Sequence, residues 1–203
     1  GFEKIDLSGF TGQHGADVTA NKNGGTIVTT GNDDVIVGGA AIDTITPGRG
    51  DDTVDITETT NTVDVINMTE ADSSTIATTA PAAAAKTDSL SGDTLVWGNG
   101  IDVVTGFVGG ASGDTVDTSV GDANLPATLT DYDDITAGAD FVIYGTWTSS
   151  TNTFTTATAF NASSAADALV FVAVTADQMS DATNIFVLDD IGAALHADNF
   201  VNA

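Results

Sequence analysis

The sequence contains no cysteine and very few basic residues. Without cysteine, no disulfide can stabilise the fold, and thiol usage gives no indication of the redox compartment. Lysine and arginine together number 4, against 29 aspartates and glutamates, and the formal net charge is −25. Because nothing resembles a basic patch, nucleic acid and anionic membrane surfaces are excluded as partners. So large a charge opposes a compact state unless cations bind or screen it, although halophilic or marine adaptation of the surface also accounts for it.

Long apolar runs are missing as well. The best two, 168–174 and 185–188, fall far short of the roughly 20 residues that span a membrane, so we expect no membrane insertion. The amino terminus carries no signal peptide. Gly1 instead falls within what reads as a strand motif, which suggests a fragment, a processed product or one domain of a larger protein.

Catalytic motifs are scarce. The two histidines, His14 and His196, stand at opposite ends of the chain, and no zinc-protease, serine-hydrolase or phosphate-loop motif occurs. Adjacent carboxylates such as Asp133-Asp134 and Asp189-Asp190 would face opposite sides of a strand. They are either further metal ligands or solvated turns. The sequence therefore nominates no enzyme.

What the sequence does have is a nine-residue period. Branched aliphatic residues recur at this spacing: Val18, Ile27, Ile36, Ile45, Val54 and Val63. The middle three are each preceded by an aspartate two positions earlier, namely Asp34, Asp43 and Asp52. Nine residues are too few for a helical hairpin but fit one half-turn of a parallel β-roll. Two units complete one coil, so residues 18 apart should stack on the same side.

The composition of the repeat has a physical explanation. A glycine-rich turn lets the backbone take positive φ and point carbonyl oxygens inward, while the aspartate supplies a carboxylate and the aliphatic residue packs into a thin core. Calcium prefers such oxygen ligands in six- to eight-fold coordination. We therefore expect a calcium ion between Asp34 and Asp52, with carbonyls near Asn32, Gly48 and Gly50 completing the shell. Ordinary turns are the alternative interpretation, since Gly, Asn and Asp dominate turns in any β-protein.

Asp43, which lies between Asp34 and Asp52 in sequence, should not share their side of the roll. We expect Asp43 on the opposite side, above Gly25 and below Asn61. A second block, 97–105, repeats the formula, and 88–96 is a weaker copy of it. Asp93 and Asp102 of these units fall on opposite sides, so each requires a different partner, such as a carbonyl or one of Asp114 and Asp117. Both blocks together give the predicted calcium ligands: Asn32, Asp34, Gly39, Ala41, Asp43, Gly48, Gly50, Asp52, Asp93, Gly98, Gly100 and Asp102.

Residues 29–55 resemble the glycine-rich nonapeptide repeats of RTX proteins, which are calcium-binding proteins secreted by Gram-negative bacteria. Residues 100–117 are similar to the segment after the repeats in serralysin-type modules. Residues 2–10 resemble the strand that ends this segment. Asn32 and Ala41 stand where the family has a turn glycine. The resemblance implies Ca²⁺ as the cofactor and export by a type I channel. Such export uses an uncleaved carboxyl-terminal signal, and 188–203 fits either that tail or an ordinary final strand and turn.

The chain divides by composition into four regions. Residues 1–68 form a first β-roll block, and 69–88 form a Thr- and Ala-rich interruption, either an exposed loop or a short helix. Residues 89–120 resume the roll, and 121–203 form a β-rich cap in which 176–181 is expected to make a helical turn. The predicted fold is therefore all-β, a parallel β-roll or β-solenoid with nine-residue half-turns followed by a β-rich capping region.

Three functions fit these features. The leading one is a calcium-dependent secreted structural protein, a subunit of a bacterial surface layer or extracellular filament that self-associates into a homopolymer or lattice through open strand edges. The second is an ancillary RTX domain that aids folding and secretion of a larger secreted enzyme. The third is an adhesin module with cell-surface polysaccharide as its partner, which an exposed aromatic groove around Tyr144 and Trp147 would support. All three place the protein outside the cell or on its surface.

Overall fold

The structure, a computed structural model, describes residues 3–68, 90–97, 100–118, 126–130, 134–158, 166–174 and 182–201. The predictions for the interruption at 69–88, for Gly98 and for the helical turn at 176–181 lie outside these residues. The described part is β-rich, and its helical elements include the short 3-10 helices η2 (Ser149–Thr151) and η4 (Ala197–Asn199). Nothing in this part of the chain is a helix long and apolar enough to cross a membrane.

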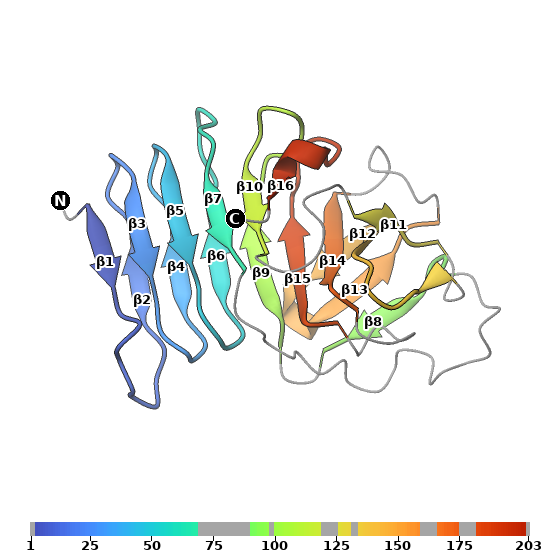
Figure 1. Ribbon diagram of the computed structural model, residues 1–203, viewed down its shortest axis with the longest axis horizontal. Coiled ribbons are helices and arrows are strands. Elements are labelled where there is room, and N and C mark those ends of the chain that lie inside the picture. The colour runs from blue at the N-terminus through green and yellow to red at the C-terminus, as the bar shows by residue number, and fades with distance from the viewer. Residues whose placement is uncertain are drawn as a thin grey trace.

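The strands form two sheets (Figure 1). Sheet A is six-stranded and wholly parallel, with its strands in the order β1 (Lys4–Asp6), β3 (Gly25–Val28), β5 (Asp43–Thr46), β7 (Val65–Asn67), β10 (Thr115–Asp117) and β16 (Phe200–Val201). Sheet B is mixed and ten-stranded, with its strands in the order β2 (Asp17–Thr19), β4 (Val35–Val37), β6 (Thr53–Asp55), β9 (Asp102–Thr105), β15 (Asn184–Asp189), β14 (Asp167–Val172), β12 (Phe141–Thr148), β13 (Thr153–Thr156) and β8 (Thr94–Val96), while β11 (Ala127–Thr128) also pairs with β12.

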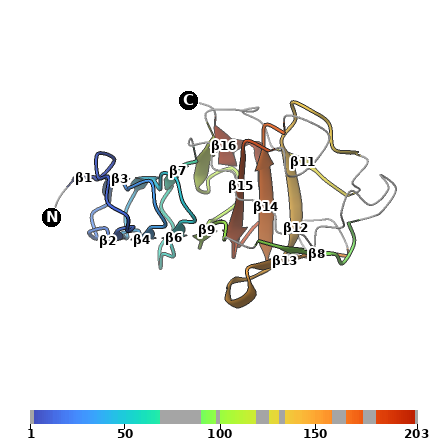
Figure 2. The ribbon, with the colours of Figure 1, turned by 90° about the horizontal axis from the view of Figure 1, so that it is seen from below.

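From β1 to β7 the chain alternates between the two sheets, which Figure 2 shows as two layers. From β2 to β6, neighbouring strands within one sheet bring together residues 18 apart, such as Ile27 beside Ile45 and Ile36 beside Val54. The aliphatic residue of each strand is buried in the shared core. The nine-residue period therefore gives the correct register for these strands.

The period breaks after Val54. Ile66 lies beside Ile45 and is fully buried, whereas Val63 is 40% exposed. From Val54 to Ile66 is 12 residues instead of 9, so the turn at 57–63 is three residues longer than the repeat predicts. The predictions that Val63 continues the period and that Asn61 stacks on Asp43 are therefore wrong, because the extra residues move Asp64 into that place.

Later strands extend both sheets, and the buried residues of each new pair of strands have the same longer spacing in sequence as those of β6 and β7. β9 pairs with β6 and β10 pairs with β7, each 50 residues further along the chain, and β15 and β16 then add to β9 and β10. The 12-residue step recurs between the buried residues of each pair: Val54 and Ile66, Val104 and Val116, Leu188 and Phe200. One core therefore runs from the first strands into the carboxyl-terminal part.

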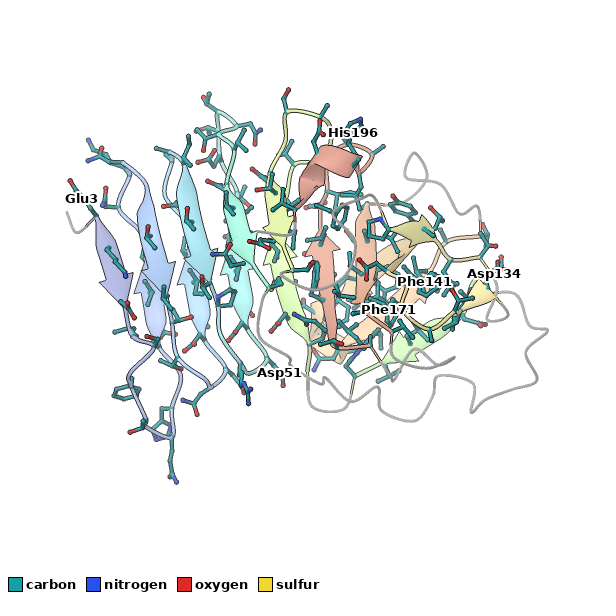
Figure 3. The ribbon with its side chains drawn as sticks, in the orientation of Figure 1. Glu3, Asp51, Asp134, Phe141, Phe171 and His196 are labelled. Carbon is teal, nitrogen blue, oxygen red and sulfur yellow. The ribbon has the colours of Figure 1, made fainter. Side chains whose placement is uncertain are left out.

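Strands β12, β14 and β15 pair antiparallel and are buried on both faces along most of their length, and β11 pairs in parallel with β12. Alternate residues of β12, β14 and β15 enter two different apolar clusters. Phe141 and Phe171, labelled in Figure 3, are paired on neighbouring strands in the second cluster. Tyr144 and Trp147 are 4% and 8% exposed, so their side chains form no exposed aromatic groove.

Candidate metal centre

Buried aspartates line the turns at one edge of the stacked strands. The backbone N–H of Asp34 donates to Oδ1 of Asp52 at 2.7 Å, and that of Asp52 donates to Oδ1 of Asp102 at 2.8 Å. Asp34 in turn accepts the Ala16 N–H at Oδ1. Asp34 and Asp52 are therefore direct neighbours, as their 18-residue spacing predicts. We call Asp34, Asp52 and Asp102 the first aspartate ladder.

The same carboxylates also shape their own turns. Oδ2 of Asp34 accepts the backbone N–H of Thr30 at 2.8 Å, and the Thr30 hydroxyl donates to Oδ1 at 3.0 Å. A side chain that accepts a backbone N–H four residues earlier closes a tight turn, which is a common role of aspartate. The residue is only 1% exposed, so these bonds replace the water that the carboxylate loses. Oδ1 thereby accepts two hydrogen bonds, from the Ala16 N–H and the Thr30 hydroxyl, which use both of its lone pairs.

Turns of successive strands pack so closely that side chains are excluded at some positions. Gly48 and Gly50 have φ of 102° and 115°, and a Cβ added to either would overlap the backbone at Thr30 or Asn32. Positive φ and close approach both require glycine here. Asn32 ties its turn to the preceding one, because its Nδ2 donates to the carbonyl of Gly12 at 3.2 Å. The predicted ligands Asn32, Gly48 and Gly50 therefore share one edge with the first ladder.

A second ladder lies at the opposite edge. The backbone N–H of Asp43 donates to Oδ1 of Asp64 at 2.8 Å, and that of Asp64 donates to Oδ1 of Asp114 at 2.9 Å. All three residues are at most 2% exposed. We call Asp43, Asp64 and Asp114 the second aspartate ladder. The sequence-based ligand set omits Asp64, although it stands two positions before a buried aliphatic residue, Ile66, as the other ladder aspartates do.

The remaining predicted ligands divide between these edges. Gly39 and Ala41 lie in the turn before β5, where the Gly39 N–H donates to Oδ2 of Asp43 at 2.5 Å. Gly100, with φ of 104°, packs against Asp51 and leads into Asp102 of the first ladder. Asp51 is labelled at the lower edge of the molecule in Figure 3. Asp93 is apart from both ladders, because it adjoins β8, which pairs antiparallel with β13.

The second ladder is electrostatically unfavourable when fully ionised. Burial raises the pKa of Asp43, Asp64 and Asp114, and the pKa of Asp64 reaches about 7. Backbone hydrogen bonds oppose these shifts, whereas the charge of Glu58 adds to all three. Burial disfavours a carboxylate unless a proton or a cation neutralises it. The second ladder is therefore a place where a bound cation would stabilise the fold.

A separate pair of carboxyl groups joins β14 to β15. Asp167 accepts the backbone N–H of Trp147 at 2.6 Å and that of Asp190 at 2.9 Å. Burial and then the charge of Asp167 raise the pKa of Asp189 to about 6, and the two carboxyl groups are also hydrogen-bonded. Protonated Asp189 therefore donates to Asp167. This pair holds strands together and does not adjoin either ladder's turns.

In the part of the chain that the structure describes, no group of three or more His, Cys, Asp or Glu side chains is arranged to hold a metal ion. A calcium ion at either edge would therefore take most of its ligands from backbone carbonyls and water, with one or two carboxylates. No protein-family model matches the chain, and the curated proteins include no match to it. Function is accordingly inferred from the ladders, the charge and the sheet edges.

Proposed function

We propose that this protein is a calcium-dependent secreted structural protein, a subunit of a bacterial surface layer or extracellular filament. The observation that carries the proposal is the pair of buried aspartate ladders in a chain with a net charge of −25. Burying ionised carboxylates costs folding free energy unless cations or protons compensate. Extracellular modules bind calcium with dissociation constants of about 10⁻⁴ to 10⁻³ M. A chain of this kind stays open in a cytosol poor in calcium and folds after export.

The proposed architecture of the stacked region is a parallel β-roll of the RTX type. Two features support it: the 18-residue register of β2, β4 and β6, and an aspartate two positions before the buried aliphatic residue at both edges. In sheet B, the antiparallel strands β14, β12 and β13 follow β15 and then cover the end of the roll. Open solenoids need such a cap for solubility.

Self-association is proposed to use the edges of the sheets. In the described residues, β1 ends sheet A at one side and β16 ends it at the other, and β2 ends sheet B. An unpaired strand edge presents N–H and C=O groups that can pair with another chain. Contact between the β1 edge of one copy and the β16 edge of the next is heterologous, and contacts of this kind build rings or open filaments.

Assembly tests this proposal. The purified chain is examined by negative-stain electron microscopy and sedimentation velocity, first in chelator and then in millimolar calcium. The proposal requires calcium-dependent filaments or ordered layers. A chain that stays monomeric and only compacts in calcium contradicts it, and favours an ancillary folding and secretion domain of a larger enzyme instead.

A further inference from the structure

The turns that lead from sheet B into sheet A differ in length along one edge of the molecule. The turn at 38–42 belongs to the nine-residue period, whereas the turn at 57–63 beside it is three residues longer than that period allows. Figure 1 shows the connection into β7 rising above the connections into β3 and β5. We call the place where the short turn at 38–42 meets the long turn at 57–63 the ledge.

Two exposed apolar side chains lie at the ledge. Ile42 is the last residue before β5 and is 62% exposed, and Val63 belongs to the long turn and is 40% exposed. The two are neighbours, because each precedes a member of the second ladder, and the N–H of Asp43 donates to Oδ1 of Asp64 at 2.8 Å. Ile42 and Val63 therefore form one apolar pair across the ledge.

Glycine flanks this pair on both sides. Because Gly25 pairs with Asp43, the residue beside Ile42 on the preceding connection is Gly24. By the same register, the hydrogen bond from Asp64 to Asp114 places Gly113 beside Val63 on the following connection. Neither glycine has a side chain, so the apolar pair projects from the edge.

Within the two turns at the ledge, the one acid is directed inward. The turn before β5 contains no acid, and the turn at 57–63 contains Glu58 alone. Oε2 of Glu58 accepts the N–H of Thr62 at 2.7 Å, and Oε1 is buried. By contrast, Val35, another exposed aliphatic residue, lies beside the exposed Asp17 on β2. Because a second copy carries the same net charge of −25, the ledge lets two copies meet without bringing exposed acids together.

We propose that the ledge is a two-fold contact between two copies of this chain. A two-fold axis at the ledge places the long turns of each copy over the short turns of the other, so the surface complements itself. Ile42 then packs against Val63 of the partner subunit, and the symmetry repeats this contact. Four apolar side chains leave water together, which stabilises the dimer. The contact lies across the roll, so it is separate from the sheet edges of the proposed function and does not depend on them.

Cysteine cross-linking tests the contact, because the chain has no cysteine of its own. The apolar cluster is small, so the dimer is weak and a covalent link is the way to detect it. Ile42→Cys is compared with Val35→Cys, the matched control at an aliphatic position that is 47% exposed. Each full chain is treated with a short bismaleimide in millimolar calcium and examined on a denaturing gel. Ile42→Cys should give a covalent dimer and Val35→Cys should stay monomeric, whereas equal yields overturn the proposal.

A second variant covers the outcome in which Ile42→Cys fails to fold. Val63→Cys places the thiol on the other side of the ledge and should also give the covalent dimer. Adding Ile42→Asn to Val63→Cys should lower the yield about tenfold or more, because a symmetric contact loses the side chain twice, whereas adding Val35→Asn should leave the yield unchanged. A yield that Ile42→Asn does not lower overturns the contact.

The cross-link and the filaments are separate readouts. Filaments without a cross-linked dimer would overturn this contact and leave the proposed structural role standing. A cross-linked dimer without filaments would support this contact and contradict that role.

Discussion

At the scale of single residues, the ladder aspartates make two kinds of contact. Four of them accept the backbone N–H of the preceding ladder residue, namely Asp52, Asp102, Asp64 and Asp114. Three accept an N–H within their own turn, namely Asp34, Asp43 and Asp114. The first contact sets the spacing between strands, and the second sets the shape of the turn. A glutamate is one methylene too long to repeat both. The aspartates therefore have a structural role whether or not a cation is bound.

Replacing Asp52 tests this dual role. Asp52→Ala leaves the buried N–H of Asp34 without its acceptor, which should cost about 1–3 kcal/mol of unfolding free energy. Asp55→Ala should cost less than about 1 kcal/mol, because Asp55 only accepts the Thr57 N–H near the surface. Urea denaturation in calcium measures both. Equal losses would contradict the assigned register.

The carboxyl pair between β14 and β15 predicts a pH dependence. The pKa of Asp189 is raised to about 6 in the folded state, from a model-peptide value of 3.8. The protonated Asp189 carboxyl therefore stabilises the fold fully below about pH 4, and this stabilisation is lost as the pH rises through about 6. Asp189→Asn keeps a donor for Asp167 and should flatten this part of the profile of unfolding free energy, measured between pH 4 and 7 at one constant, saturating concentration of calcium.

Asp17→Asn is the control for that profile, because Asp17 is an exposed residue of β2. It should leave the fall in stability unchanged. The account of the Asp167 and Asp189 pair is wrong if the wild type and Asp189→Asn lose stability in parallel over this range.

At the scale of elements, the turn at 57–63 shows what the sequence can predict. The positions from Val18 to Val54 follow from the aliphatic period, because in that region every half-turn has the same length. The position of β7 does not follow from the period, because Val63 and Ile66 are both branched aliphatic residues and either could be the buried residue of the strand. Only the packing of the turn selects Ile66. The omission of Asp64 from the predicted ligands has the same cause.

The pairing of β8 shows a second limit. Asp93 and Leu95 match the repeat pattern, yet β8 pairs antiparallel with β13 instead of stacking beside β6. A short alternation of polar and apolar residues indicates a half-buried strand but not its partner. Long-range pairing places β9 beside β6 across 50 residues of sequence. Such pairing is decided by the whole core and not by the local pattern.

The register of β7 is tested by two core substitutions. Ile66→Ala should lower the unfolding free energy by about 2–5 kcal/mol, because Ile66 is fully buried. Val63→Ala removes methyl groups from a side chain that is 40% exposed, so its cost should stay below about 1 kcal/mol. Chemical denaturation of both variants in the same buffer gives the comparison. The reverse order of effects would show that the turn has the length of the repeat.

At the scale of the whole molecule, one sheet leaves a strand open for another copy. Glu3 accepts the N–H of Thr26 at 3.0 Å and Leu7 donates to Val28 at 2.8 Å, so the odd-numbered residues of this edge face β3. Backbone groups of adjacent residues in a strand point to opposite sides. The N–H of Lys4 therefore points away from the sheet and is available to a second chain.

Lys4→Pro should abolish assembly, because proline removes that outward N–H without removing a bond between β1 and β3. Lys4→Ala is the matched control, since it also loses the ion pair with Asp6 but keeps the N–H. Sedimentation velocity in millimolar calcium distinguishes them. If Lys4→Pro assembles like Lys4→Ala, contact between chains does not use β1.

The central claim is that calcium stabilises the folded chain through its carboxylate-lined turns. The most direct test is thermal unfolding of the wild type at pH 8 in chelator, in millimolar CaCl₂ and in the same concentration of MgCl₂. We predict a higher Tm in calcium than in the other two, with a gain of about 0.4–1.4 kcal/mol per site, because millimolar calcium is about one to ten times the Kd of an extracellular module. The same Tm in all three solutions would contradict the account.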